Sequence, residues 1–246
     1  VQSASTVTER VTLQQTICRE GTAVLTDRQN LLLQPGESRT VSFRYCVDSP
    51  ALWSPEDPNL YTSTMQVLEG EEELDREETG FGIRTLSIDA AHGVRINGQT
   101  VKLRGACIHH DNGILGAATL PDAEERRIRQ LKEAGFNAIR SSHHPAGRAL
   151  LDACDRYGVL VMDELSDVWN VRKNPYDYAL YFEQDWKPTI QKMVAKDYNH
   201  PSVILYCVGN EISEAGSESG AETNRRLCNT FRELDPTRYT TNALNG

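Results

Sequence analysis

Two neighbouring polar residues, Asn210 and Glu211, end a long apolar stretch and carry groups suited to acid–base chemistry. Residues 203–208 have no polar position, which predicts a strand buried on both faces, as in a parallel sheet. In barrels that alternate strands with helices, catalytic groups lie at the carboxyl ends of the strands. A carboxylate at such an end, preceded by an amide, is placed to donate and accept protons. The alternative is that Glu211 caps the next helix or pairs with an arginine.

Polar side chains also end three other predicted strands, namely His109, His143 and Glu164. A ring of polar groups at strand ends is what an active site at the mouth of a barrel requires. Arg104 and Arg140 lie within predicted strands, where we expect them to orient carboxylates by bidentate pairing.

Strands and helices alternate after about residue 100, which predicts a parallel sheet with right-handed crossovers. The expected strands cover 101–108, 136–140, 159–164, 203–208 and 238–243, and the expected helices cover 122–134, 146–157, a segment around 190–195, and 224–234. An open doubly wound sheet and a barrel both fit this order. The first strand-to-helix turn lacks a glycine-rich phosphate loop, so a dinucleotide site is unsupported, and the polar strand ends favour the barrel.

Local signals predict where these helices begin and end. Asp122 and Glu125 have the spacing of a capping box and predict the start of the first helix, and Gly135 fits its end. Gly158 closes the second helix. Pro188 is expected in the first turn of the third helix, where the missing N–H is tolerated.

Residues 1–88 are predicted to form an all-β domain. Strands are expected at 11–14, 31–37, 40–45 and 61–68. The mostly acidic stretch 69–78 is expected at a solvated hairpin tip, because clustered charge resists burial. Short strands between frequent turns favour an immunoglobulin-like β-sandwich. About five strands are fewer than a complete one needs, so its first strands are expected to be missing.

The residues after 88 are too few for a complete eight-stranded barrel, which takes about 200 to 250 residues. We therefore divide the chain into a sandwich, 1–88, and the N-terminal part of a TIM-barrel catalytic domain, 89–246. The fold class expected is an immunoglobulin-like β-sandwich followed by an incomplete (β/α)8 TIM barrel, and the chain is expected to be a fragment.

The composition is that of an ordinary globular chain, with 246 residues of which 39% are hydrophobic and 25% charged. The formal net charge of −9 argues against nucleic acid, and no apolar run approaches a membrane span. The first residues lack the features of a signal peptide and an initiator Met, which leaves cytoplasmic and periplasmic localisation open. The six cysteines follow no zinc spacing and are expected to be reduced, buried thiols.

Adjacent histidines at two strand ends, His109-His110 and His143-His144, raise the question of zinc, which such clusters bind in barrels. No third ligand follows at a regular spacing, and the order H-x-H is absent. We therefore expect no metal site and no cofactor.

Six short motifs follow one another along the chain. They are Trp53-Ser54-Pro55 with Pro58-Asn59-Leu60-Tyr61, Gly80-Phe81-Gly82-Ile83-Arg84, Asn97-Gly98 with Leu103-Arg104-Gly105 and His109, Arg140-Ser141-Ser142-His143-His144-Pro145, Asp163-Glu164 with Trp169, and Asn199-His200-Pro201-Ser202 leading to Gly209-Asn210-Glu211. Together they resemble glycoside hydrolase family 2, the family of β-galactosidases and β-glucuronidases, from about residue 10 to the C-terminus. The first resembles the end of the family's immunoglobulin-like domain, the second its junction with the barrel, and the others the first four barrel strands. This ordered context favours a functional Glu211.

The resemblance implies a retaining, β-galactosidase-like β-glycosidase that hydrolyses terminal β-linked sugars. It makes Glu211 the general acid/base and places the nucleophile, a second Glu, on a strand beyond this chain, so the chain alone is expected to be inactive. Asn210 is expected to hydrogen-bond a sugar hydroxyl next to the reacting carbon. His109 and His143 are expected to bind further hydroxyls, and the alternative for both is a structural role with their ring nitrogens satisfied within the protein.

Three further residues of the expected site carry alternatives. Of Asp163 and Glu164, one is expected to accept a sugar hydroxyl and the other to pair with an arginine. Trp169 is expected to stack on a sugar or to pack in the core. Some β-galactosidases of the family bind magnesium near the acid/base, but the ligand positions fall at about Val168 and Asn170, which do not suit that role.

Two other functions stay open: a carbohydrate-binding or interaction module that has lost catalysis, and a metal-dependent barrel hydrolase. The expected partner is a carbohydrate substrate, with no nucleic acid and no membrane. The last predicted strand, 238–243, would leave an unpaired edge that invites a second chain, which makes a homo-oligomer an open expectation. The sugar and its linkage do not follow from the sequence.

Overall fold

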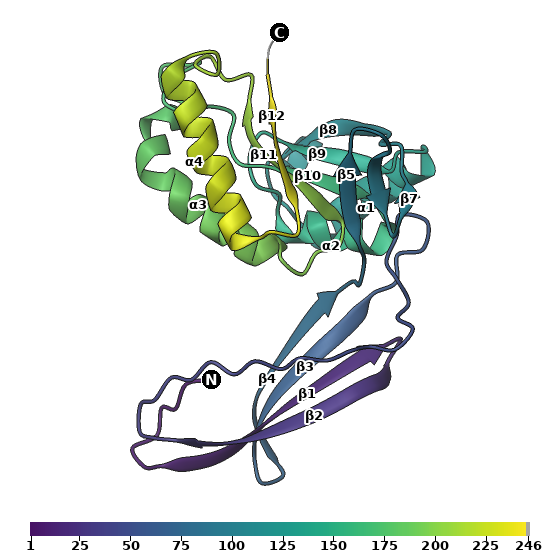
Figure 1. Ribbon diagram of the computed structural model, residues 1–246, viewed down its shortest axis with the longest axis vertical. Helices are drawn as coiled ribbons and strands as arrows, with labels where there is room; N and C mark the ends of the chain where they lie inside the picture. The colour runs from purple at the N-terminus through teal and green to yellow at the C-terminus, as the bar shows by residue number, and fades with distance from the viewer. Residues whose placement is uncertain (245–246) are drawn as a thin grey trace. The chain divides into compact units, whose positions relative to one another are not determined.

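The chain forms two compact units in a computed structural model that describes residues 1–244 (Figure 1). The first unit comprises Val1–Ala51 and Leu60–Ile83. The second comprises Leu52–Asn59 and the segment from Arg84 onward. The second unit thus begins with a short excursion from the middle of the first, and the main boundary between the units falls at Ile83 and Arg84.

The first unit is built on a four-stranded antiparallel sheet with the order β2-β1-β3-β4. Its strands are β1 (Glu9–Arg19), β2 (Thr22–Leu33), β3 (Tyr61–Glu69) and β4 (Glu72–Phe81). Its core is made by Val11, Leu13, Leu31 and Leu33, all of which are buried. These residues are the apolar members of two alternating strands, so one face of the sheet is the packed face.

Two expectations for this unit need correction. The segment 40–45 was expected to be a strand, but it is not part of one. Its side chains alternate in exposure, and Val41 and Phe43 pack against the core. The acidic stretch 69–78 was expected at a hairpin tip, whereas most of it is strand β4 and the tip is the turn at Gly70. Strand β4 keeps its charged side chains exposed, which is how the sheet accommodates them.

The second unit is built on a five-stranded parallel sheet with the order β12-β11-β10-β9-β8. Its strands are β8 (Gly105–His109), β9 (Ala138–Ser142), β10 (Leu160–Glu164), β11 (Val203–Asn210) and β12 (Tyr239–Ala243). Helices α1 (Pro121–Glu133), α2 (Arg148–Tyr157), α3 (Phe182–Asp197) and α4 (Glu218–Leu234) connect them in turn. Because each strand lies beside its predecessor, the strand order is that of a barrel wall rather than of a doubly wound sheet.

Smaller elements complete this unit. They are a three-stranded antiparallel sheet, β5 (Leu86–Asp89), β6 (Gly93–Ile96) and β7 (Gln99–Thr100), and two short 3-10 helices, η1 (Gly113–Leu115) and η2 (Tyr178–Leu180). The hairpin between β6 and β7 turns at Asn97 and Gly98, both at positive φ, as the Asn-Gly pair predicts.

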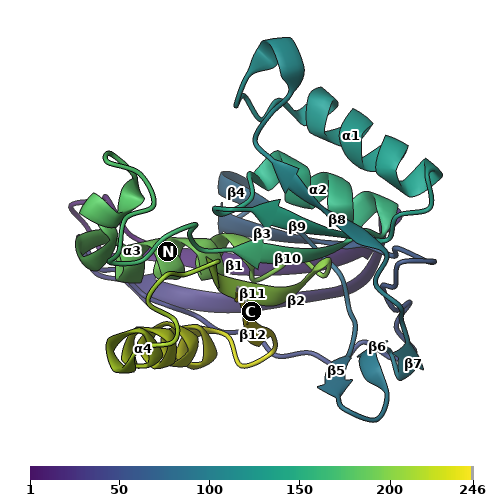
Figure 2. The same ribbon diagram turned by 90° about the horizontal axis from the view of Figure 1, so that it is seen from above.

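The main core lies between the parallel sheet and its helices (Figure 2). Leu151, Phe182, Ile190 and Phe231 reach it from the helices and are almost fully buried. The other face of the sheet carries a hollow of about 240 Å³ with a mainly apolar lining. In a closed barrel that face points inward, so the five strands present an inner wall and an outer, helix-covered wall.

Helices α2 and α4 begin at Arg148 and Glu218 rather than at 146 and 224, and the start signals expected for α1 and α3 differ as well. Helix α1 begins at Pro121 after Leu120, with no side-chain cap, so the capping box expected at Asp122 is not formed. Proline at the first helical position already tolerates the missing N–H and presets φ. Helix α3 begins at Phe182, well before Pro188, so the proline lies inside the helix and not in its first turn. Phe182 is buried, and this packing extends the helix upstream.

The excursion 52–59 packs within the second unit. Trp53 is fully buried, and its indole Nε1 donates a hydrogen bond to the carbonyl oxygen of Asp155 at 2.9 Å. Gly158, which ends α2 in the left-handed conformation as expected, lies so close to Pro55 that a Cβ there would be 2.3 Å from the Pro55 carbonyl oxygen. Among residues 1–244, no helix is both long and apolar enough to cross a membrane.

Candidate active site

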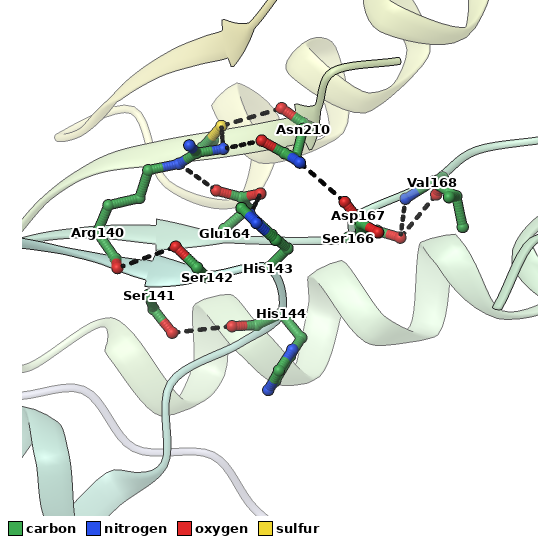
Figure 3. A network of polar contacts seen from close by, with 12 residues as sticks. Arg140, Ser141, Ser142, His143, His144, Glu164, Ser166, Asp167, Val168 and Asn210 are labelled. Carbon is green, nitrogen blue, oxygen red and sulfur yellow. Dashed lines mark hydrogen bonds and ion pairs between the residues drawn. The ribbon is translucent and has the colours of Figure 1, made fainter. Parts of the chain in front are cut away.

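Arg140 in the middle of β9 meets Glu164 and Asn210, the last residues of β10 and β11 (Figure 3). The Arg140 guanidinium donates through Nε to Glu164 Oε2 and through Nη2 to Asn210 Oδ1, the latter at 2.9 Å. Burial lowers the pKa of Arg140, but the hydrogen bond and charge of Glu164 outweigh it and raise that pKa overall. Arg140 therefore stays charged and links two neighbouring strand ends.

Glu164 is fully buried, and both of its carboxylate oxygens are engaged. Oε2 accepts from Arg140, and Oε1 lies 2.9 Å from His143 Nδ1. Of the two acids that end β10, Glu164 is thus the one that pairs with an arginine. Because it has no exposed surface, Glu164 is placed to orient His143 rather than to contact a substrate.

The Asn210 side chain is held at both ends of its amide. Its oxygen accepts from Arg140, and its nitrogen donates to Asp167 Oδ1 at 2.9 Å. Arginine can only donate and an ionised aspartate can only accept, so the two neighbours fix which way the amide points. An amide nitrogen carries two hydrogens, so one N–H of Asn210 remains for a further acceptor.

Asp167 and Lys173 belong to this cluster and were missed in the sequence. Lys173 Nζ donates to Asp167 Oδ1 at 2.7 Å and to the backbone oxygen of Asn210 at 2.8 Å. Burial raises the pKa of Asp167. The hydrogen bonds from Lys173 and Asn210 lower that pKa by more than burial raises it, so the net shift is downward. An acid three residues after a strand end was a signal for Asp167; a single lysine in a long loop gave none for Lys173.

Glu211 is exposed and directly follows the last residue of β11. Its backbone has φ +46°, in the left-handed region, and its N–H donates to the oxygen of Ala243 at 2.7 Å. Among residues 1–244, no hydrogen bond to its carboxylate is found. Unlike Glu164, Glu211 therefore presents a carboxyl group that has no hydrogen-bond partner within the described residues.

Four histidines surround the ends of β8 and β9 in two contacting pairs. The rings of His109 and His143 meet edge to face with centroids 5.2 Å apart, and His109 is exposed. The rings of His110 and His144 lie 4.4 Å apart, and burial lowers the pKa of each. The structure thus brings the two predicted histidines, His109 and His143, together beside Glu164.

Asp163 and Trp169 are not brought to this surface. Asp163 is fully buried, and its Oδ1 accepts from the N–H of Ala146 at 2.8 Å while Oδ2 lies 3.4 Å from Lys196 Nζ. Trp169 is also fully buried in the main core, and its Nε1 donates to the oxygen of Val208 at 2.9 Å. A fully covered ring leaves no face for a sugar, so core packing is the reading that fits Trp169.

Arg104 does not orient a carboxylate, in contrast to Arg140. Its Nε donates to the oxygen of Gly135 at 3.1 Å, and its side chain stays at the start of β8. The expectation for Arg104 was wrong because the residue precedes the strand, at the end of the sheet opposite the cluster.

Three ligand-type residues approach one another elsewhere: Asp152, Asp155 and His200, with donor atoms within 4.8 Å. Asp155 is already engaged, since its Oδ2 lies 2.6 Å from His200 Nδ1 and its Oδ1 accepts from the N–H of Ser202 at 3.0 Å. These contacts tie α2 to the start of β11, at the end of the sheet opposite Asn210.

Comparisons with known proteins agree with this architecture. The family description "Glycosyl hydrolases family 2, TIM barrel domain" matches residues 90–245, and "Glycosyl hydrolases family 2" matches residues 1–84. Beta-galactosidase BoGH2A of Bacteroides ovatus is 42% identical over 204 residues, which are 83% of this chain and 24% of that protein. Beta-glucuronidase of Bacteroides fragilis is 28% identical over 240 residues, which are 94% of this chain and 34% of that protein.

A solved structure of a glycosyl hydrolase family 2 member from Bacteroides cellulosilyticus matches with a TM-score of 0.91 and 42% identity. The match covers 98% of this chain and 31% of that one. The chain therefore spans only about a third, or less, of the length of these relatives. The expected fold class, an immunoglobulin-like β-sandwich followed by an incomplete TIM barrel, is confirmed. The TIM barrel domain of this family matches well over half of the residues of the chain, so the chain belongs to glycosyl hydrolase family 2.

Proposed function

We propose that the protein carrying this chain is a retaining β-glycosidase acting on terminal β-linked sugars, with Glu211 as its general acid/base. The observation that carries the proposal is the exposed Glu211 carboxyl beside the fixed amide of Asn210, at the carboxyl end of a barrel strand. Relatives named beta-galactosidase and beta-glucuronidase support a β-glycosidase, and the 42% identity to a beta-galactosidase favours galactosides.

The acid/base role is assigned to Glu211 because the carboxyl groups of Glu164 and Asp163 are already hydrogen-bonded. Both oxygens of Glu164 contact Arg140 and His143, and Asp163 is buried against Ala146 and Lys196. General acid catalysis needs a carboxyl that can reach the leaving oxygen of the substrate. Glu211 is exposed, so it can meet a glycosidic oxygen from the open side of the strand end.

Retention requires two carboxyl groups about 5 to 5.5 Å apart. In the first step Glu211 gives its proton to the leaving oxygen while a nucleophilic carboxylate bonds to the sugar carbon. In the second step Glu211 takes a proton from water, and the water oxygen displaces that carboxylate. The nucleophile is proposed to be a glutamate on a later barrel strand, outside this chain.

Asn210, His109 and His143 are proposed to hold the sugar. The free N–H of Asn210 can donate to a hydroxyl next to the reacting carbon, a bond that strengthens in the transition state. His109 is exposed and contacts His143, so the pair offers ring nitrogens to further hydroxyls. Arg140, Glu164 and Asp167 are assigned the supporting role of holding these groups in place.

The substitution Glu211→Gln tests the acid/base role in a full-length protein that contains this chain. Hydrolysis of alkyl β-glycosides, whose leaving groups need a proton, is expected to fall by about 10²- to 10⁴-fold. Nitrophenyl β-glycosides are expected to lose much less in the glycosylation step, because nitrophenolate leaves without a proton. The measurement is kcat/KM on both substrate types, with galactosides and glucuronides compared.

Glu218→Gln is the control, because Glu218 is exposed in the first turn of α4. Equal losses on both substrate types in Glu211→Gln would show that Glu211 is not the acid. Sugar binding without any turnover by the unsubstituted protein would instead support a non-catalytic carbohydrate-binding module.

A further inference from the structure

The peptide group between Asn210 and Glu211 is held at both of its polar ends. Its carbonyl oxygen accepts from Lys173 Nζ at 2.8 Å, and its N–H donates to the oxygen of Ala243 at 2.7 Å. The two atoms belong to one planar unit, so two bonds on opposite sides fix the rotation of the whole plane. That plane sets the direction in which the Glu211 side chain leaves the strand.

The backbone conformation of Glu211 needs such support. At φ +46° the residue lies in the left-handed region, which a side chain with a Cβ disfavours. Conformations of this kind persist where the surroundings over-determine them, and they concentrate at functional sites. One of the two bonds that hold this peptide comes from a charged ammonium, which makes a stronger bond than a neutral donor.

Lys173 is itself fixed by a closed set of contacts. Its Nζ also donates to Asp167 Oδ1 at 2.7 Å, and the same oxygen accepts from Asn210 Nδ2 at 2.9 Å. Lys173, Asp167 and Asn210 therefore form a ring that joins the side chain of Asn210 to its own carbonyl. The Lys173 side chain is 23% exposed, so water screens this ring only in part.

The loop between β10 and α3 holds the Lys173 backbone in place. Glu214 Oε1 accepts from the N–H groups of Asn170 at 2.8 Å and Val171 at 3.1 Å, and Asp177 Oδ2 accepts from the N–H of Lys173 at 2.7 Å. Glu214 follows Glu211 by three residues in the next loop. The two loops are thus tied to each other on either side of the acid/base.

We propose that Lys173 is a positioning residue for Glu211, which rests on the proposed acid/base role. Its ammonium holds the Asn210–Glu211 peptide in the orientation that aims the Glu211 carboxyl at the leaving oxygen. Lys173 acts through the backbone and does not itself bond to the reacting atoms. The loop between β10 and α3 therefore contributes to acid catalysis through a single charged contact.

Lys173→Met removes the ammonium while keeping a side chain of similar length. Misplacing a catalytic group by about 1 Å can cost about 100-fold, so a loss of kcat up to that size is expected on alkyl β-glycosides. Nitrophenyl β-glycosides are expected to lose clearly less, and KM is expected to change little. Lys173→Arg, which restores a cation, is expected to recover part of the loss. Lys187→Met, on an exposed lysine of α3, is the matched control.

The dependence on the leaving group separates the outcomes. Disturbing Asn210 alone would slow both substrate types alike, so a selective loss on alkyl glycosides points to Glu211. Lys173→Met behaving like Lys187→Met, or losing equally on both substrates, would overturn the proposal while Glu211→Gln still shows its selective loss. If Glu211→Gln shows no selectivity, the acid/base assignment and the role of Lys173 fall together. Should Lys173→Met not fold, Lys173→Gln gives the same readout.

Discussion

The Glu164 carboxyl group is shielded from solvent and pairs with two neighbours, so Arg140 contributes to stability as well as to the site. Glu164 has no exposed surface, and Arg140 and His143 take its two oxygens. Breaking a buried ion pair by removing one partner leaves an uncompensated charge, which costs about 3–5 kcal/mol. Arg140→Met is therefore expected to lower the free energy of unfolding by about that amount.

Urea unfolding of Arg140→Met and of Arg156→Met measures this difference. Arg156 pairs with Glu125 at 2.8 Å on the surface, where both side chains are well exposed, so its loss is expected to cost about 1 kcal/mol or less. Equal destabilisation in the two variants would mean that Glu164 finds another hydrogen-bond partner when Arg140 is gone.

At the scale of residues, the sequence predicts that Asn210, Glu211, His109 and His143 lie at strand ends. In the structure Asn210 and His109 are the last residues of β11 and β8, and Glu211 and His143 directly follow β11 and β9. The assignment of Asp163 and Glu164 stayed open because neighbouring residues of a strand point to opposite faces, and the pattern does not say which face is the outer one. Loop residues follow no period, so Lys173 carried no signal at all.

The connection from α4 to β12 depends on one buried acid, Asp235. Its Oδ2 accepts from Arg238 Nη1 at 2.6 Å and from the Tyr206 hydroxyl at 3.2 Å, and its Oδ1 accepts from the N–H of Thr237 at 2.9 Å. Burial raises the pKa of Asp235. The hydrogen bonds from Thr237 and Arg238 lower that pKa by more than burial raises it, so the net shift is downward. The ionised form therefore stabilises the fold.

This shift predicts how stability responds to acid. A group whose pKa is lower in the folded state contributes stability above its unfolded pKa, about 3.9, and loses it as the pH falls through the folded pKa. Asp235→Asn is expected to be less stable than the unsubstituted protein at neutral pH and to lose less stability below about pH 4. Urea midpoints between about pH 2 and pH 7 give both quantities.

Asp122→Asn is the control for this experiment, since Asp122 is exposed at the start of α1. An Asp235→Asn variant with the full acid sensitivity of the unsubstituted protein would contradict the role assigned to Asp235.

At the scale of elements, the periodicity of apolar residues predicts the order of strands and helices after about residue 100, and the structure confirms that part. The ends are less predictable. Pro121 competes with Asp122 to begin α1, and the local rule that wins depends on the path of the preceding chain. Pro188 lies inside α3 because Phe182 finds a buried place upstream, which is a matter of tertiary packing.

At the scale of the molecule, the second unit joins stretches that are about a hundred residues apart in the sequence. Gly158 closes α2 at φ +65°, and a Cβ there would lie 2.3 Å from the Pro55 oxygen. Gly158→Ala is therefore expected to be strongly destabilising, because the left-handed backbone and the clash act together. Gly135→Ala is the matched control, since Gly135 has φ +90° and nothing within 4 Å of its Cβ position.

Thermal or urea unfolding of the two variants isolates the contact with Pro55. The control is expected to lose about 1–2 kcal/mol from the backbone conformation alone. If Gly158→Ala loses no more than this, the excursion 52–59 moves away at little cost.

The excursion also shows what the sequence does not reveal about the whole molecule. The motif Trp53-Ser54-Pro55 resembles the end of the family's immunoglobulin-like domain, yet Trp53 is buried in the second unit against Asp155. No period or turn signal indicates a partner a hundred residues away, so such a contact follows from the structure only.

The strand order of the parallel sheet has a consequence for biosynthesis. Each strand pairs with the one that the ribosome delivered just before it, from β8 to β12, so the wall can grow as the nascent chain emerges. Each added strand also widens an apolar inner face, which already forms a hollow of about 240 Å³. In a longer protein of this family, that face stays open until later strands arrive. Translation pauses in this interval would prolong the exposure of the apolar inner face to solvent. Holdase chaperones, which bind apolar surface, would then bind this face.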